Sequence, residues 1–338
     1  MRSRSLHALM ACVLALLLPA CGGGPGKSGE EGGAGSGKKI TIVMIGKSEA
    51  NAVFLAARAG AHAAAADITR KGGVQVTVDW ETPAQEDPAA QAQRIKDAVD
   101  AHADAILVAC SNADRLAPAI DDAVARGVQV MTFDSDAPQS KRFAFYGVDD
   151  VKTGAGVMSE LATVLEGKGA VAILAGNPEA PNLQHRVQGV QQEAKNHPGI
   201  RIVGVYSHVE TPQAATAAVL KAQAEHPEIK GWAMVGAWPL FGPKLLTALP
   251  AGARVVAVDA LPAELDYVDK GIAPVLLAQP VYQWGYVGVQ TIVDHLQNKP
   301  VPEHITMDLV RVSKQNLGDW AHQLQAWGFN VPQRYLSN

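Results

Sequence analysis

Residues 40–54 read ITIVMIGKSEANAVF. The first six positions are almost all apolar, and a glycine and several polar residues follow before the next apolar segment. A short apolar run with such an end is typical of a buried strand in a parallel sheet. Runs of this kind alternate with longer amphipathic segments down the chain, so the sequence predicts an α/β fold of parallel strands joined by crossover helices. The expected strands are residues 40–45, 74–79, 105–109, 129–133, 170–174, 202–206, 232–235, 255–258 and 275–278.

Two of the intervening helices have clear start signals. Asp87 and Thr211 each precede a proline. Asp and Thr side chains cap helix N-termini, and a proline at the first helical position loses no hydrogen bond. We therefore expect helices to begin at Pro88 and Pro212.

Polar residues follow most of the expected strands. In open parallel sheets, ligands bind beyond the carboxyl ends of the strands, where loops and helix N-termini converge. The segments at these ends are rich in carboxylates, amides and aromatic rings, a chemistry suited to a small polyol. They are residues 46–51, 111–114, 134–136, 176–178, 236–238, 259–261 and 279–280.

Length, charge and missing motifs limit the function. A chain of 338 residues exceeds what one core usually organises, so two lobes are expected. The 29 Lys and Arg against 33 Asp and Glu give a net charge of -4, which argues against a nucleic-acid partner. The chain has no G-x-G-x-x-G after the first strand, no G-x-S-x-G, no H-E-x-x-H and no C-x-x-C. We therefore expect no enzyme, no metal and no other cofactor.

The N-terminus has the pattern of an export signal. Arg2 and Arg4 precede an apolar run at residues 9–18, and the small residue Ala20 precedes Cys21. The run has ten residues, whereas a membrane-spanning helix needs about 20. We therefore expect a cleaved signal peptide.

A lipid anchor is expected at Cys21. Residues 18–21, Leu-Pro-Ala-Cys, resemble the lipobox of bacterial lipoproteins, in which the cysteine is acylated. Residues 22–39 are rich in glycine, as in a flexible tether. The expected segments are a signal peptide over 1–20 and a lipidated tether over 21–39, which implies a periplasmic or cell-surface lipoprotein held to the membrane by its acyl chains.

Five short motifs occur in an order and spacing that match a known family. They are Asn51-Ala-Val-Phe54, Val130-Met-Thr-Phe-Asp-Ser-Asp136, Asn182-Leu-Gln-His-Arg186, Val255-Val-Ala-Val-Asp259 and Ala278-Gln279-Pro280. From residue 40 to about 314 the chain resembles the type I periplasmic solute-binding proteins, specifically the ribose- and xylose-binding group of sugar ABC transporters.

The resemblance implies two doubly wound parallel-sheet lobes joined by a hinge of three segments, with the ligand in the cleft between them. By analogy, the N-terminal lobe comprises residues 40–148 and 280–307. The C-terminal lobe comprises residues 149–279 and 308–338.

The resemblance also implies a set of binding residues. Asp134 and Asp259 would accept hydrogen bonds from sugar hydroxyls, Arg186 would donate, and Asn51 and Gln279 would supply amides. Such a mixture is needed because each sugar hydroxyl both donates and accepts in a dry cleft. A further expected residue is Phe54, which would face the C–H side of the ring.

Three positions depart from the ribose-binding pattern. Lys47 stands where the pattern has a small hydroxyl residue, and Ser135 stands where it has an arginine. Gly236 replaces an asparagine, and Trp238 two residues later could serve as a stacking platform. We include Lys47, Ser135 and Trp238 among the expected ligand contacts, although these departures favour a ligand other than ribose.

The sequence thus predicts the monomeric receptor of an ABC importer, which binds a small sugar-like molecule and presents it to a permease and ATPase. One alternative is a sensor of a sugar-like signal, such as autoinducer-2, coupled to a membrane kinase. A second is an α/β enzyme that uses Asp134 or Asp259 as a general base.

Overall fold

The computed structural model describes residues 38–337, and the expected signal peptide, Cys21 and almost all of the tether lie outside this range. Two six-stranded sheets organise the described chain. Sheet A has the order β11 (His304–Thr306), β5 (Ala144–Gly147), β4 (Gln129–Phe133), β3 (Ala105–Val108), β1 (Lys38–Ile45) and β2 (Val74–Trp80). Sheet B has the order β12 (Val310–Ser313), β10 (Val275–Ala278), β9 (Arg254–Val258), β8 (Ile229–Met234), β6 (Lys168–Gly176) and β7 (Gly199–Ser207).

All strand pairs in sheet A are parallel, whereas sheet B has one antiparallel pair, between β10 and β12. All nine expected strands are present, with ends that differ by up to three residues. The expected fold class of two parallel-sheet α/β lobes is confirmed.

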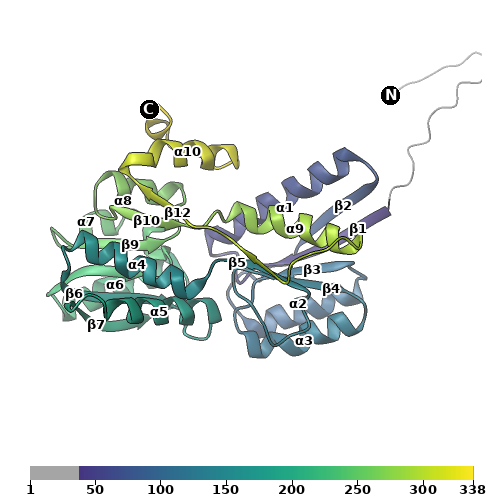
Figure 1. Cartoon of the computed structure of the whole chain (residues 1–338), viewed down its shortest axis with the longest axis horizontal. Coiled ribbons are helices and arrows are strands. Elements are labelled where there is room, and N and C mark those ends of the chain that lie inside the picture. Colours follow the sequence, from purple (N-terminus) through teal and green to yellow (C-terminus); the bar gives the residue numbers. More distant parts are fainter. Residues whose placement is uncertain (1–37, 338) are drawn as a thin grey trace, which may run out of the picture. The chain divides into compact units, whose positions relative to one another are not determined.

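Helices cover both faces of each sheet. In sheet A, α1 and α9 pack together on one side, and α2 and α3 pack together on the other (Figure 1). We call each sheet with its helices a lobe. Lobe A contains α1 (Ala52–Lys71), α2 (Pro88–Asp100), α3 (Ala113–Ala125) and α9 (Tyr282–Leu296). Lobe B contains α4 (Asp150–Val164), α5 (Pro181–Ala194), α6 (Pro212–Glu225), α7 (Leu245–Ala248), α8 (Leu265–Asp269), α10 (Leu317–Ala326) and the short 3-10 turn η1 (Trp238–Phe241).

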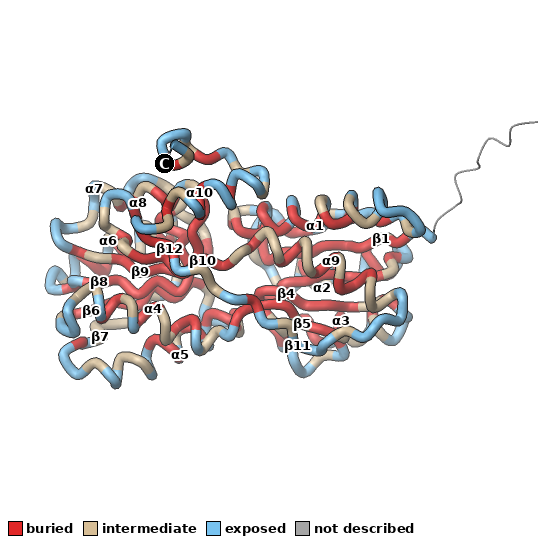
Figure 2. Tube along the Cα trace, turned by 45° about the horizontal axis from the view of Figure 1, so that its top comes forward, coloured by how far each residue is buried: buried red, intermediate tan, exposed pale blue. Residues whose placement is uncertain are grey.

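The alternation of side chains along β1 explains the two layers of helices. Ile42 and Met44 point into the core formed with α1 and α9, whereas Val43 and Ile45 join the core formed with α2 and α3. Because successive residues of a strand face opposite sides, a strand buried on both sides is apolar throughout. The inner strands of both sheets are accordingly buried over most of their length (Figure 2), whereas the edge strands β2, β7, β11 and β12 are partly exposed.

The expected helix starts are confirmed. The Asp87 carboxylate accepts hydrogen bonds from the backbone N–H groups of Ala89 and Ala90 at the start of α2. Thr211 caps α6 in the same way.

The chain passes between the two sheets three times within residues 38–337. The crossings lie between β5 and β6, between β10 and α9, and between β11 and β12. The exact lobe boundaries expected from the resemblance stay a prediction.

Candidate functional site

The two expected acidic residues stand directly after buried strands of different lobes. Asp134 follows β4, and Asp259 follows β9. Both residues have a positive φ, 56° and 84°, a backbone region that L-residues rarely adopt. Each carboxylate is almost fully buried. Strained backbone of this kind is concentrated at functional sites, where the surrounding fold fixes it.

Lobe A supplies three further residues from the first βα connection. Lys47 lies just after β1, and its side chain is buried. Asn51 caps α1, with its Oδ1 accepting a hydrogen bond from the N–H of Val53. Phe54 belongs to the first turn of α1 and packs against the rings of Phe133 and Trp284.

Arg186 extends from α5 of lobe B and makes three hydrogen bonds. It donates from Nε to Asp150 at 2.8 Å, from Nη1 to the carbonyl of Val235 at 3.1 Å and from Nη2 to Gln279 at 3.0 Å. The helix that carries it lies very close to α4, because a Cβ on Gly154 would be only 1.8 Å from the carbonyl oxygen of Arg186. The close approach of the two helices at Arg186 therefore requires a glycine at position 154.

Gln279 joins Arg186 to Asp259. Its Oε1 accepts from Arg186, and its Nε2 donates to Asp259 Oδ1 at 2.9 Å. This pattern fixes the orientation of the amide, since oxygen faces the guanidinium and nitrogen faces the carboxylate.

Trp238 stands in η1, and two glycines make room for its ring. A Cβ on either Gly176 or Gly236 would lie 2.6 Å from Trp238 Cη2. The edge of the ring system also meets His208, with ring centroids 4.9 Å apart. Because a side chain at position 236 would collide with the Trp238 ring, this position of the ring requires a glycine at 236.

Eight of the nine expected ligand-contact residues line one cavity between the lobes, with about 20 Å³ of free space. This space is comparable to that of one water molecule, so a sugar requires the lobes to separate. The lining residues are Lys47, Asn51, Val53, Phe54, Asp134, Asn182, Leu183, Arg186, Glu210, Gly236, Trp238, Asp259 and Gln279. Ser135 is the exception: it is fully buried, lies outside this lining, and its Oγ has no hydrogen-bond partner among the described residues.

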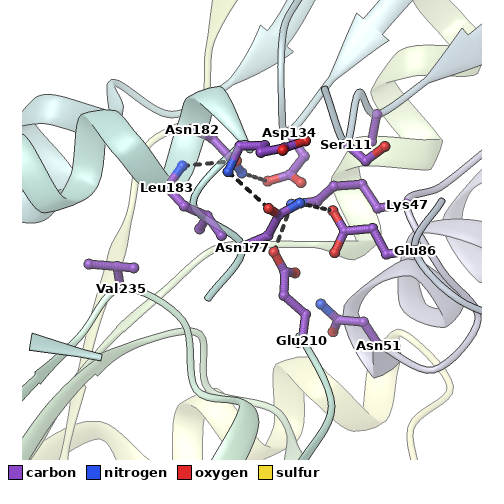
Figure 3. Close-up of polar contacts among 12 residues, drawn as sticks. Lys47, Asn51, Glu86, Ser111, Asp134, Asn177, Asn182, Leu183, Glu210 and Val235 are labelled. Carbon is purple, nitrogen blue, oxygen red and sulfur yellow. Dashed lines mark hydrogen bonds and ion pairs between the residues drawn. The ribbon is translucent and has the colours of Figure 1, made fainter. Parts of the chain in front are cut away.

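Side chains of the two lobes already touch across the cavity (Figure 3). Lys47 Nζ lies 3.4 Å from Glu210 Oε1, and Asn182 donates to Asp134 at 3.1 Å. The Asp134 carboxylate also lies 3.7 Å from Arg186 Nη2. These contacts join the lobes in the closed arrangement.

Glu86 of lobe A accepts a hydrogen bond from Asn177 of lobe B at 2.8 Å, near the same cavity (Figure 3). The sequence reasoning missed Glu86 and Glu210, because it did not apply the strand-end rule to the segments after β2 and β7. Both glutamates lie in those segments. The rule could therefore have found them.

Burial raises the pKa values of the carboxyl groups in and near the cavity. It raises the pKa of Asp259 to about 6, although Arg186 and the Gln279 hydrogen bond act against it. It likewise raises the pKa of Asp150 to about 7 and that of Glu86 to about 7, and moves the pKa of Asp134 upward.

The pKa of Lys47 shifts in the direction opposite to that of an isolated buried lysine. Burial lowers its pKa, but Glu210, Asp134 and Glu86 outweigh that effect, so the pKa lies above its ordinary value. The ammonium therefore stays charged in the cavity wall.

Within residues 38–337, no group of three or more His, Cys, Asp or Glu side chains has the arrangement of a metal site. Over the same part of the chain, no helix has both the length and the apolar character needed to cross a membrane.

A family model described as periplasmic binding protein domain matches residues 42–300. Among curated proteins, the chain is 30% identical to the ribose import binding protein RbsB of Bacillus subtilis over 174 residues, which are 51% of this chain and 54% of that protein. It is 26% identical to a D-ribose/D-allose-binding protein of Pseudomonas aeruginosa, over 79% of this chain and 85% of the relative. The match thus spans about half the length of the first relative and most of the second.

A solved structure is also similar. It is an ABC transporter solute binding protein from Burkholderia graminis in complex with D-arabinose, with a TM-score of 0.76 and 26% identity. The match covers 82% of this chain and 96% of that one.

Proposed function

Because this chain belongs to the periplasmic binding protein domain family, we propose that it is the extracytoplasmic receptor of an ABC importer, which binds a small sugar or sugar-like ligand between its lobes. The observation that carries the proposal is a cavity lined by charged, amide and aromatic side chains from both lobes, which contains eight of the nine expected contact residues. The names of similar proteins agree with it, since they refer to ribose, allose and arabinose.

The proposed binding residues divide between the lobes. Lobe A offers Asn51 and Asp134, whereas lobe B offers Arg186 and Asp259. A ligand that touches all four gains contacts only when the lobes are closed. Because such a ligand binds the closed form more tightly than the open form, its binding shifts the protein toward the closed form.

The ligand must also compete with contacts inside the protein. Lys47 with Glu210, and Asp134 with Asn182, already join the two lobes. We propose that the ligand replaces some of these contacts on entry. The protein binds and releases its ligand without chemical conversion.

The proposal includes export and anchoring. The signal peptide over 1–20 would direct export and be cleaved, and the acylated Cys21 would then hold the receptor at the membrane, outside the cytoplasm, where it meets a permease and its ATPase. Incorporation of radiolabelled palmitate into the full chain, and its loss in Cys21→Ser, test this part.

A thermal-shift screen of the purified protein tests the binding function. The panel contains pentoses, hexoses, sugar acids, polyols and amino sugars. A ligand at 100 times its dissociation constant stabilises the folded state by about 2.7 kcal/mol. We expect at least one compound to raise the melting temperature, to bind with one-to-one stoichiometry and to be recovered unchanged. A panel without a single shift, or conversion of the ligand, would overturn the proposal.

A further inference from the structure

Asp259 is a buried carboxylate in the cavity wall that lacks an ionic partner. Gln279 donates to its Oδ1, but within the described residues the carboxylate forms no ion pair. Arg186 acts on it only from a longer distance, since its guanidinium is engaged with Asp150, Val235 and Gln279. A buried charge is costly unless it is paired, so this position favours a cation from outside the protein.

The cavity wall and the side chains next to it carry more acid than base. Two cations, Lys47 and Arg186, stand among five buried or nearly buried carboxylates. Asp134, Glu210 and Asp259 line the cavity. The other two, Glu86 and Asp150, lie next to it, within electrostatic range of Lys47 and Arg186. Of the five carboxylates, Glu210 and Asp150 take the nearest positions to the two cations, at 3.4 and 2.8 Å. Asp134 has only the longer contact of 3.7 Å to Arg186.

A second observation lies beside the cavity. A groove of about 690 Å³ shares Asn182 with it. Five acidic residues line this groove, and neither Lys nor Arg does so in the described chain: they are Asp114, Asp136, Asp149, Asp150 and Glu179. Three of the five pair with cations outside the lining: Asp136 with Arg142, Asp149 with Lys152 and Asp150 with Arg186. An acidic approach of this kind concentrates cations near its surface and disfavours anions.

We propose that the ligand of this cleft carries a protonated amine, as an amino sugar or an aminated polyol, and that its ammonium group binds the carboxylate of Asp259. The proposal rests on the function proposed above and specifies the class of ligand. Asp134 and Arg186 would hold hydroxyl groups of the same molecule.

An ammonium group fits this position better than a hydroxyl. It donates three hydrogen bonds and neutralises the carboxylate, whereas a hydroxyl donates one and leaves the charge in place. A sugar acid fits less well, because its carboxylate would add to the acidic excess around Lys47. The aromatic ring of Trp238, in the same wall, can face the C–H side of the ligand or its ammonium group.

Matched pairs of ligands test the proposal. We would titrate the purified protein at about pH 7 with D-glucosamine and D-glucose, D-galactosamine and D-galactose, and glucamine and sorbitol. Within each pair the skeleton is the same, and only an amine replaces a hydroxyl. We expect at least one amine to bind about tenfold more tightly than its hydroxyl partner, because the ammonium group neutralises the buried carboxylate whereas the hydroxyl leaves it charged.

Asp259→Asn identifies the carboxylate responsible. This variant should lose most of the preference for the amine, while its affinity for the hydroxyl partner changes less. The exposed Asp319→Asn on α10 is the matched control and should keep the preference. If Asp259→Asn does not fold, Asp259→Ser serves in its place, with melting curves recorded for every variant.

Three outcomes would overturn the proposal: hydroxyl members that bind as tightly as the amines, no amine that binds at all, or an amine preference that survives in Asp259→Asn. The function proposed above fails separately, when no neutral sugar or polyol and no amine shifts the melting temperature. If a neutral sugar binds and the amines do not, the proposed receptor function still holds, and only the proposal of an amine ligand fails.

Discussion

Lys47 Nζ of lobe A lies 3.4 Å from Glu210 Oε1 of lobe B, and each side chain is only 3% exposed. The pair closes the cavity from both sides. Around it stand further carboxylates, those of Asp134 and Glu86, which hold the lysine in its charged form. The two members of the pair are therefore not equivalent. Lys47 is one of only two cations that line the cavity in the described chain, whereas Glu210 is one of several carboxylates near it.

This asymmetry predicts unequal costs of removal. Lys47→Met leaves several buried carboxylates facing one another, and we expect it to lower the free energy of unfolding by about 3 kcal/mol at neutral pH. Glu210→Gln leaves the lysine near two other acids and should cost less than about 1 kcal/mol, close to the loss of one net hydrogen bond. Urea denaturation measures both. An equal or reversed order would contradict the acidic excess.

Asp259→Asn should stabilise the ligand-free protein in a pH-dependent way. The pKa of Asp259 is raised from 3.8 to about 6, first by burial and then by the nearby Asp134 and Glu210, against the effect of Arg186 and Gln279. The buried Glu264 also lies within electrostatic range of it. Because the folded state holds this proton more firmly than the unfolded state, the wild-type carboxyl lowers stability as the pH rises from about 4 to 6.

Asparagine removes that cost. At about pH 7.5 the variant should be more stable than the wild type by up to about 3 kcal/mol, and the difference should shrink steadily toward pH 4. Melting curves across this range give the measurement, with the exposed Asp319→Asn as the matched control. A difference that is constant with pH, or that grows as the pH falls, would show that the carboxyl is not held in this way.

Gly236→Ala should disturb the cavity through Trp238. A Cβ at position 236 would lie 2.6 Å from Cη2 of that ring, so the tryptophan must move. We expect a loss of about 1–3 kcal/mol of stability, a changed tryptophan emission and weaker ligand binding. Gly242→Ala is the matched control, since nothing lies within 4 Å of a Cβ there. Normal ligand affinity in a folded Gly236→Ala protein would mean that the ring position does not matter for binding.

Most of the strands that the sequence predicts are buried on both faces; the exceptions are the longer edge strands β2 and β7. Runs such as residues 105–108 are apolar throughout, because both sides of the sheet are covered by helices. The strands that it misses are short. β5, β11 and β12 have four residues or fewer, and β11 and β12 are edge strands whose half-exposed residues give no continuous apolar run.

The site follows the same logic. The strand-end rule, together with the family resemblance, leads to Asp134, Arg186 and Asp259, and the fold brings all three to one cavity. Ser135 shows its limit. It is next to Asp134 in the chain, but it is turned away from the cavity lining, because neighbours after a strand need not share a direction. Glu210 and Glu86 come from loops whose approach to Lys47 depends on how the lobes meet, which no local pattern encodes.

The most direct test of the central claim is calorimetric titration of the tightest ligand from the screen into the wild type, Asp134→Ala and Asp259→Ala. The claim is that one ligand is held by carboxylates of both lobes at once. We predict one binding site per chain in the wild type and an affinity at least about tenfold weaker in each folded variant, since each loses a charged hydrogen bond. Wild-type affinity in either folded variant would contradict the claim.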